Sequence, residues 1–286
     1  RFSYPKRKFL GLFYIWIWFF KNILLLKDAD IVHIHDVFIW YLPFCFIFPF
    51  KPVYITFHGW EGVYPIPFKN ILYKKIAAKL ARGNICVGSY ISTRYHIDAD
   101  FVVYGAVKNF PKKIKKEDRK IVYVGRLEKD NGLPLLLKVF SRLKNFRIDF
   151  CGDGSLAKEC LKYGKVHGFV NAKPFLSKAK FCFAGGYLSI LEAFSQKSLV
   201  VTAYENSFRE EYLRETPFAK WMIIGNSENE LLNKIEIYAR DNEKAGFVIT
   251  RAYNWVKKRT WKELAKVYLT LWQKRFNSKS KEVSIV

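Results

Sequence analysis

Cysteine and methionine are both rare in this sequence. No Cys-x-x-Cys pair occurs among its five cysteines, which are Cys45, Cys86, Cys151, Cys160 and Cys182. This odd and scattered set indicates neither a disulfide framework nor a thiolate zinc site, and it favours free thiols in a reducing cytosol. The single methionine is Met222, and the chain begins with Arg1. We therefore expect the N-terminal part to be incomplete.

No apolar run has the length of about 20 residues that a membrane-spanning helix needs. The two candidates are residues 9–20 and residues 37–50, and the second contains two prolines. Basic residues precede the first run, as in a signal peptide, but no small-residue cleavage site follows it. Three interpretations stay open: a helix buried in the core, an aromatic and basic surface that contacts an anionic membrane without crossing it, and, least favoured by the lengths, a transmembrane helix.

Acidic residues are scarce. The chain has 25 aspartates and glutamates against 49 lysines and arginines, so its formal net charge is +24. Such a charge attracts nucleic acids, anionic lipids or phosphorylated substrates. The cations are spread along the chain and no nucleic-acid-binding module accompanies them, so we expect no nucleic-acid partner. Binding of DNA through charge alone is the alternative, and it predicts a steep salt dependence.

What the sequence does contain is an alternation of strand and helix patterns, with half of its residues apolar. The patterns predict strands at 30–35, 51–57, 85–87, 101–104, 121–124, 146–150, 166–170, 180–183 and 199–202. They predict helices at 69–80, 134–143, 188–195, 228–239 and 255–276. Residues 111–120 are charged, lack apolar periodicity and are predicted to form a linker. The alternation predicts an α/β protein with parallel sheets covered on both faces.

Glycines recur at the expected strand ends of the second half: Gly125, Gly152, Gly154, Gly168, Gly185 and Gly186. Open α/β sheets bind ligands beyond the carboxyl ends of their strands, and glycine lets backbone amides approach a ligand. The last two glycines directly precede a predicted helix, whose first amides and dipole would suit a diphosphate. Each glycine alone could serve an ordinary turn, so it is their recurrence that indicates a phosphate site.

Several segments stand in an order typical of one enzyme family. They are DIVHIHD (30–36), ITFHG (55–59), GRL (125–127), CGDGSL (151–156), HGFV (167–170), GGYLSILEA (185–193), SLVVTA (198–203) and TWKELAKVYLTLW (260–272). Together they resemble the GT-B glycosyltransferases of family 4, within glycosyltransferase group 1, over roughly residues 28 to 273. The resemblance implies two Rossmann-like domains facing a cleft: an incomplete N-terminal domain at 1–110 and a nucleotide-sugar-binding domain at 111–253. A closing helix at 254–276 and a polar tail at 277–286 would follow.

The resemblance also implies roles for single residues. Arg126 matches the arginine that pairs with the donor diphosphate, a task suited to a guanidinium, although a surface salt bridge is the alternative. Glu192 matches the glutamate that binds the nucleotide ribose, and His58 matches a histidine beside the transferred sugar. The implied catalytic set is therefore His58, Arg126 and Glu192. The implied donor-binding set is Gly125, Arg126, Lys129, Asn131, Gly152, Gly154, Gly185, Gly186, Tyr187, Leu188 and Glu192.

The sequence departs from the family pattern in three places. Asn131 stands where the family has a lysine, and Lys129 is the neighbouring cation that could reach the phosphates. Ala184 stands where the family has a glutamate that contacts the donor sugar. Nothing before residue 28 matches the family's first strand and its glycine-rich loop. We therefore expect the first domain to be short by about two strands.

The function implied is that of a retaining transferase in polysaccharide biosynthesis. It would move a hexose from a UDP- or GDP-sugar to a glycan or lipid-linked acceptor, at the inner face of the membrane. We expect no metal or other cofactor, because arginine and helix amides would replace the metal, and the pair His33 and His35 has no third ligand at suitable spacing. The alternative is a catalytically degenerate GT-B partner subunit, which Ala184 and Asn131 favour.

Overall fold

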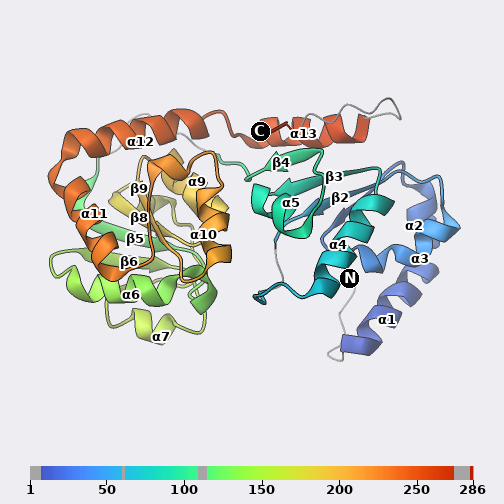
Figure 1. Ribbon diagram of the computed structural model, residues 1–286, viewed down its shortest axis with the longest axis horizontal. Coiled ribbons are helices and arrows are strands. Elements are labelled where there is room, and N and C mark those ends of the chain that lie inside the picture. Colours follow the sequence, from blue (N-terminus) through green and yellow to red (C-terminus); the bar gives the residue numbers. More distant parts are fainter. Residues whose placement is uncertain (1–7, 60–61, 109–114, 274–283, 286) are drawn as a thin grey trace. The chain divides into compact units, whose positions relative to one another are not determined.

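The computed structural model describes residues 8–59, 62–108, 115–273 and 284–285. Its contacts divide the chain into two compact units, one with residues 1–103 and 266–286 and the other with residues 104–265. Each unit contains a parallel sheet with helices packed against it (Figure 1). The predicted class, α/β with two Rossmann-like parallel-sheet domains, is confirmed.

The first unit has a parallel sheet in the order β1-β2-β3-β4-β11. Its strands are β1 (Val32–His35), β2 (Val53–Phe57), β3 (Gly83–Val87), β4 (Phe101–Val103) and β11 (Ser284–Ile285). Its helices are α1 (Lys8–Lys21), α2 (Ile23–Asp28), η1 (Phe38–Trp40), α3 (Leu42–Ile47), α4 (Phe68–Leu80) and α5 (Ser89–Tyr95). All five residues of β2 are buried, as expected of a strand inside a sheet that is covered on both faces.

The apolar run at 9–20 forms α1, and only part of it reaches the core. Ile15 is buried, whereas Phe13, Ile17 and Phe20 are each about half exposed. No helix within the described residues combines the length and the apolar character needed to cross a membrane. The first run is therefore neither a fully buried helix nor a spanning one.

The second unit has a six-stranded parallel sheet in the order β10-β9-β8-β5-β6-β7. Its strands are β5 (Glu117–Val124), β6 (Arg147–Cys151), β7 (Lys165–Val166), β8 (Ala179–Ala184), β9 (Leu199–Ala203) and β10 (Met222–Gly225). Its first helices are η2 (Lys129–Asn131), α6 (Leu133–Arg142), α7 (Ala157–Cys160), α8 (Lys173–Leu176) and α9 (Tyr187–Ser195). The later ones are α10 (Ser207–Arg214), η3 (Ala219–Trp221), α11 (Glu228–Arg240), α12 (Asn242–Val256) and α13 (Trp261–Gln273), whose last residues belong to the first unit.

Aromatic packing fixes the second sheet. Helices α6 and α11 pack together and contact β9 and β10, whereas α9 and α12 pack together and contact β8 and β9 (Figure 1). Between α6 and the sheet, the ring of Phe140 lies 5.6 Å from that of Phe150 and 4.7 Å from that of Phe183. This core holds β6 and β8, and with them the loops that follow their carboxyl ends.

Three predicted elements differ from the observed ones. Strand β5 begins at Glu117, inside the predicted linker, because Glu117 pairs with Ala179 across a register shift and its carboxylate binds the guanidinium of Arg147. The strand predicted at 166–170 ends at Val166, since Gly168 turns the chain with a φ of 71°. Where one closing helix was predicted, residues 257–260 separate α12 from α13. Residues 111–114 of the linker and residues 277–283 and 286 of the predicted polar tail lie outside the described residues, and residues 284–285 of that tail form β11.

Candidate functional site

Two glycine loops meet at the carboxyl ends of β5 and β6. Gly152 lies so close to the first loop that a Cβ there would be 1.8 Å from the carbonyl oxygen of Gly125, so a side chain does not fit. The carboxylate of Glu128 accepts hydrogen bonds from the amide and hydroxyl of Ser155 at 2.8 and 2.6 Å. These bonds lower the pKa of Glu128. Gly154 also packs against the first loop, with a Cβ position 2.5 Å from the carbonyl oxygen of Leu127.

Hydrogen bonds hold the backbone of Arg126, and its exposed side chain pairs with Asp130. The carbonyl oxygen of Arg126 accepts hydrogen bonds from the Tyr123 hydroxyl at 2.9 Å and from the Asn131 amide at 3.0 Å. The side chain is 66% exposed, and its guanidinium pairs with the carboxylate of Asp130 at 2.8 Å. Asn131 is buried and shapes this loop, whereas Lys129 is exposed. An anion that binds Arg126 therefore competes with Asp130.

The loop after β8 adjoins the loop after β5. A Cβ on Gly185 would lie 3.0 Å from side-chain carbons of Asn131, and a Cβ on Gly125 would lie 3.7 Å from the amide nitrogen of Gly185. Helix α9 begins two residues later at Tyr187, so its positive end faces the same edge of the sheet. The structure thus brings together the glycines and Arg126 that the sequence singled out.

Two of the amides at the start of α9 already have partners. The amide of Gly186 donates to Ser189 Oγ at 3.2 Å, and the amide of Tyr187 donates to the Tyr212 hydroxyl at 3.1 Å. The rings of Tyr187 and Tyr212 are parallel, with centroids 4.1 Å apart. These two amides could therefore bind a ligand only if it displaced the hydroxyl groups of Ser189 and Tyr212.

Glu192 lies on α9, beyond its first turn. Burial raises the pKa of its carboxyl group, and the nearby charge of Lys173 opposes this. A half-buried carboxylate in the second turn of α9 can accept hydrogen bonds from sugar hydroxyls. Ala184, the last residue of β8, is fully buried, and its methyl side chain offers a ligand no polar group.

His58 belongs to the first unit, at the carboxyl end of β2. Its Nε2 lies 2.7 Å from Nδ1 of His35, and its backbone amide donates to Asp36 Oδ1 at 2.8 Å. Lys74 in turn lies 3.9 Å from Asp36 and donates to the carbonyl of Gly59. Burial lowers the pKa of His58, as do the nearby charges of His35 and Lys74, while Asp36 opposes them. Sequence analysis did not identify Asp36 and Lys74 as partners of this histidine.

A third histidine extends this cluster into the core. His33 lies with its ring centroid 5.2 Å from that of His35, as two residues on one face of a strand should. Its Nδ1 accepts a hydrogen bond from Trp272 at 2.8 Å, and its Nε2 lies 2.8 Å from Thr56 Oγ. Burial, followed by the charges of His35 and His58, lowers the pKa of His33 to about 4. Within the described residues, no group of three or more His, Cys, Asp or Glu side chains could hold a metal ion.

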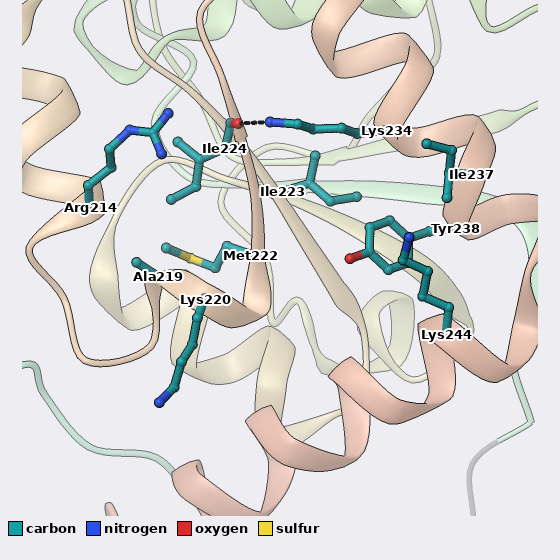
Figure 2. Close-up of a pocket in the computed structure, with 10 residues that line it drawn as sticks. All are labelled: Arg214, Ala219, Lys220, Met222, Ile223, Ile224, Lys234, Ile237, Tyr238 and Lys244. Carbon is teal, nitrogen blue, oxygen red and sulfur yellow. Dashed lines mark hydrogen bonds between the residues drawn. The ribbon is translucent and has the colours of Figure 1, made fainter.

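A separate pocket lies along the edge strand β10, away from the predicted donor residues. Figure 2 shows the residues that line it, among them Ile223 on β10 and Ile237 on α11. The cavity volume is about 430 Å³. Lys234 reaches across it and donates to the carbonyl oxygen of Ile224 at 2.9 Å. Arg214, Lys220 and Lys244 also line the pocket.

Comparison with known proteins assigns the chain to a family. Residues 107–255 match the model of the glycosyl transferases group 1. The chain belongs to this family. Every donor-binding residue predicted for this group 1 glycosyltransferase lies in the matched segment, whereas His58 lies before it. No curated protein matches the chain.

Solved structures show the GT-B fold. TarM superposes with a TM-score of 0.69 at 17% identity, covering 92% of this chain and 58% of TarM. A glycosyltransferase from Rickettsia africae gives a TM-score of 0.67 at 16% identity, covering 96% of this chain and 85% of that one. Anabaena HepE, solved with UDP and glucose, gives a TM-score of 0.66 at 15% identity, covering 87% of this chain and 80% of HepE. This group 1 glycosyltransferase thus spans less than two thirds of TarM.

Proposed function

We propose that this protein is a retaining, metal-independent glycosyltransferase of family 4. It transfers a hexose from a UDP- or GDP-sugar to a glycan or lipid-linked acceptor during polysaccharide biosynthesis. The observation that carries the proposal is the meeting of the Gly125–Asn131 loop with Gly185 and the start of α9 at one edge of the second sheet. Anabaena HepE, which shares this fold, was solved with UDP and glucose.

The proposed chemistry follows from the charge that develops in the reaction. As the bond from the sugar to the diphosphate breaks, negative charge grows on the diphosphate. Arg126 and the free amides at the start of α9 stabilise that charge, and Glu192 accepts hydrogen bonds from the ribose hydroxyls. His58 orients the sugar. The departing diphosphate takes the proton of the acceptor hydroxyl as the new glycosidic bond forms on the same face of the sugar.

Nucleotide binding gives the direct test. At a ligand concentration 100 times its Kd, a nucleotide stabilises the folded protein by about 2.7 kcal/mol. We expect UDP or GDP to raise the melting temperature of the wild type, and Arg126→Ala to abolish this rise. Arg142→Ala is the matched control, since Arg142 is an exposed arginine that pairs with Glu228 on another surface. If neither nucleotide raises the melting temperature of the wild type, the proposal is wrong.

A catalytically degenerate partner subunit is the second candidate. Two observations favour it: Ala184 is buried and has no polar side chain to contact a sugar, and the guanidinium of Arg126 already pairs with Asp130. Both candidates predict nucleotide binding, so the distinction needs a turnover assay. Release of UDP or GDP from nucleotide sugars by the purified protein, abolished in Arg126→Ala, supports the enzyme. Binding without any release supports the partner subunit.

A cytoplasmic enzyme at the inner membrane face is the setting that we propose. Helices α1, α2, η1 and α3 pack together in the first unit. These helices, and Phe50 shortly after α3, expose large apolar side chains. Those on the helices are Phe13, Tyr14, Ile17, Phe20, Leu24, Leu25, Ile39, Trp40, Phe46 and Ile47. Lys21 and Lys27 are exposed on the same helices, and basic residues near a bilayer each contribute about 1 kcal/mol of attraction to anionic lipids.

The membrane contact can be tested without disturbing the core. Phe46 and Phe50 are 81% and 87% exposed, so replacing both with serine should leave folding intact. We expect the wild type to sediment with vesicles containing phosphatidylglycerol and the double variant to stay in solution. Phe169→Ser is the control, because Phe169 is 99% exposed and lies in the second unit. Equal sedimentation of the wild type and the double variant contradicts the contact.

A further inference from the structure

Arg209 lies in the first turn of α10, next to the loop that follows β8. Its guanidinium donates through Nη2 to the carbonyl oxygen of Gly185. The same group lies over the ring of Tyr212, 4.6 Å from the ring centroid. The backbone of Arg209 is held by the N-terminal cap of α10, where its amide donates to Asn206 Oδ1 at 2.8 Å.

Among the described residues, Arg209 has no acidic side chain as a counterion. Its side chain is partly buried, and its Nε is fully buried with no hydrogen-bond partner. Across the described ranges, no ion pair joins Arg209 to a carboxylate, whereas Arg126 pairs with Asp130 and Arg214 pairs with Glu210. Removing a guanidinium from water without an anionic partner is costly. A bound anion would offset this cost.

The neighbours of Arg209 point to the donor site as the place of that anion. Gly185, whose carbonyl Arg209 contacts, adjoins Gly125 and Asn131. Burial raises the pKa of the Tyr123 hydroxyl, and the charges of Arg209 and Arg126 both act to lower it. Geometry agrees with this: a Cβ on Gly125 would lie 3.6 Å from the Tyr123 hydroxyl and 3.7 Å from the amide of Gly185, the residue whose carbonyl Arg209 binds, and the same hydroxyl donates to the carbonyl of Arg126.

We propose that Arg209 is the second cation that binds the diphosphate of the nucleotide-sugar donor. This inference rests on the proposed function. A diphosphate carries at least two negative charges, and Arg126 reaches it only in competition with Asp130. Asn131 contributes no charge and is committed to the Arg126 carbonyl. Arg209 supplies a second fork of N–H donors, which suits phosphate oxygens.

Binding of UDP, UMP and uridine by isothermal titration calorimetry tests the inference, with GDP, GMP and guanosine if the wild type prefers guanine nucleotides. We expect Arg209→Gln to weaken UDP binding by about tenfold or more, because a charge-assisted contact to phosphate is lost. Uridine binding should change less than threefold. Arg214→Gln is the matched control: it lies on the same helix, pairs with Glu210 and lines the separate pocket beside β10. Its UDP affinity should equal that of the wild type.

Each outcome decides a different point. UDP binding by Arg209→Gln within threefold of the wild type, alongside loss of binding in Arg126→Ala, overturns the role of Arg209 and leaves the proposed function standing. Equal weakening of UDP, UMP and uridine also overturns it, since a merely structural role predicts that pattern. If Arg209→Gln fails to fold, the same titrations with Arg209→Lys take its place. We then expect weaker UDP binding than in the wild type and unchanged uridine binding. A wild type that binds neither UDP nor GDP overturns both proposals.

Discussion

Replacing Gly152 with alanine should break the contact between the two glycine loops. The new Cβ would lie 1.8 Å from the carbonyl oxygen of Gly125, whereas ordinary C···O contacts are about 3.3–3.6 Å, so the backbones must separate by about 1.5 Å. That movement disrupts the hydrogen bond from the Gly125 amide to the Cys151 carbonyl and the bridge between Gly152 and Gly168. Overpacking costs about 1–3 kcal/mol and a lost hydrogen bond about 1 kcal/mol. We therefore expect a loss of about 2–4 kcal/mol.

Thermal unfolding followed by calorimetry measures this loss. For a unit of this size, 1 kcal/mol corresponds to about 2–4 °C, so the melting temperature of the second unit should fall by about 5–15 °C. Gly246→Ala is the control, because Gly246 lies within α12 with nothing within 4 Å of a Cβ position. Alanine is favoured over glycine inside a helix by about 1 kcal/mol, so this variant should be unchanged or more stable. A Gly152→Ala protein that melts within 2 °C of the wild type would refute the steric argument.

Two further predictions concern hydrogen-bonded side chains. Tyr212→Phe leaves the amide of Tyr187 without its acceptor and should lower the free energy of unfolding by about 1–3 kcal/mol in urea titrations; an unchanged midpoint would contradict the role of this hydroxyl. The pKa of His33 is about 4 in the folded state against 6.5 when unfolded, so its contribution to stability is complete above pH 6.5 and declines as the pH falls through 4. With allowance for solvent screening, this amounts to about 1–2 kcal/mol. Urea unfolding of the wild type and His33→Gln at pH 7 and pH 4.5 checks this, and equal pH dependence in the two proteins would count against it.

Local patterns predicted the elements whose burial repeats with a clear period. Strand β8 is buried at every position, and α6 presents a continuous apolar face, so both were located to within about two residues. Elements that form only through pairing or packing with distant segments were missed. The start of β5 is highly charged, and only its pairing with β8 makes it a strand. Likewise, α10 is rich in charged residues, and Phe208 and Leu213 are its only buried apolar side chains.

The sequence by itself determined the α/β class, the glycines at the strand ends and the candidate Arg126. These are local properties, because periodicity and turn chemistry depend on residues that are close together in the sequence. Only the tertiary structure decided which groups meet there. It placed Arg209 and Tyr212 against a loop more than 20 positions earlier, and it gave the amide of Tyr187 a hydroxyl partner. It also turned Asn131 inward to hold the Arg126 carbonyl. Contacts of this kind depend on how helices pack onto the sheet, and no spacing along the chain encodes them.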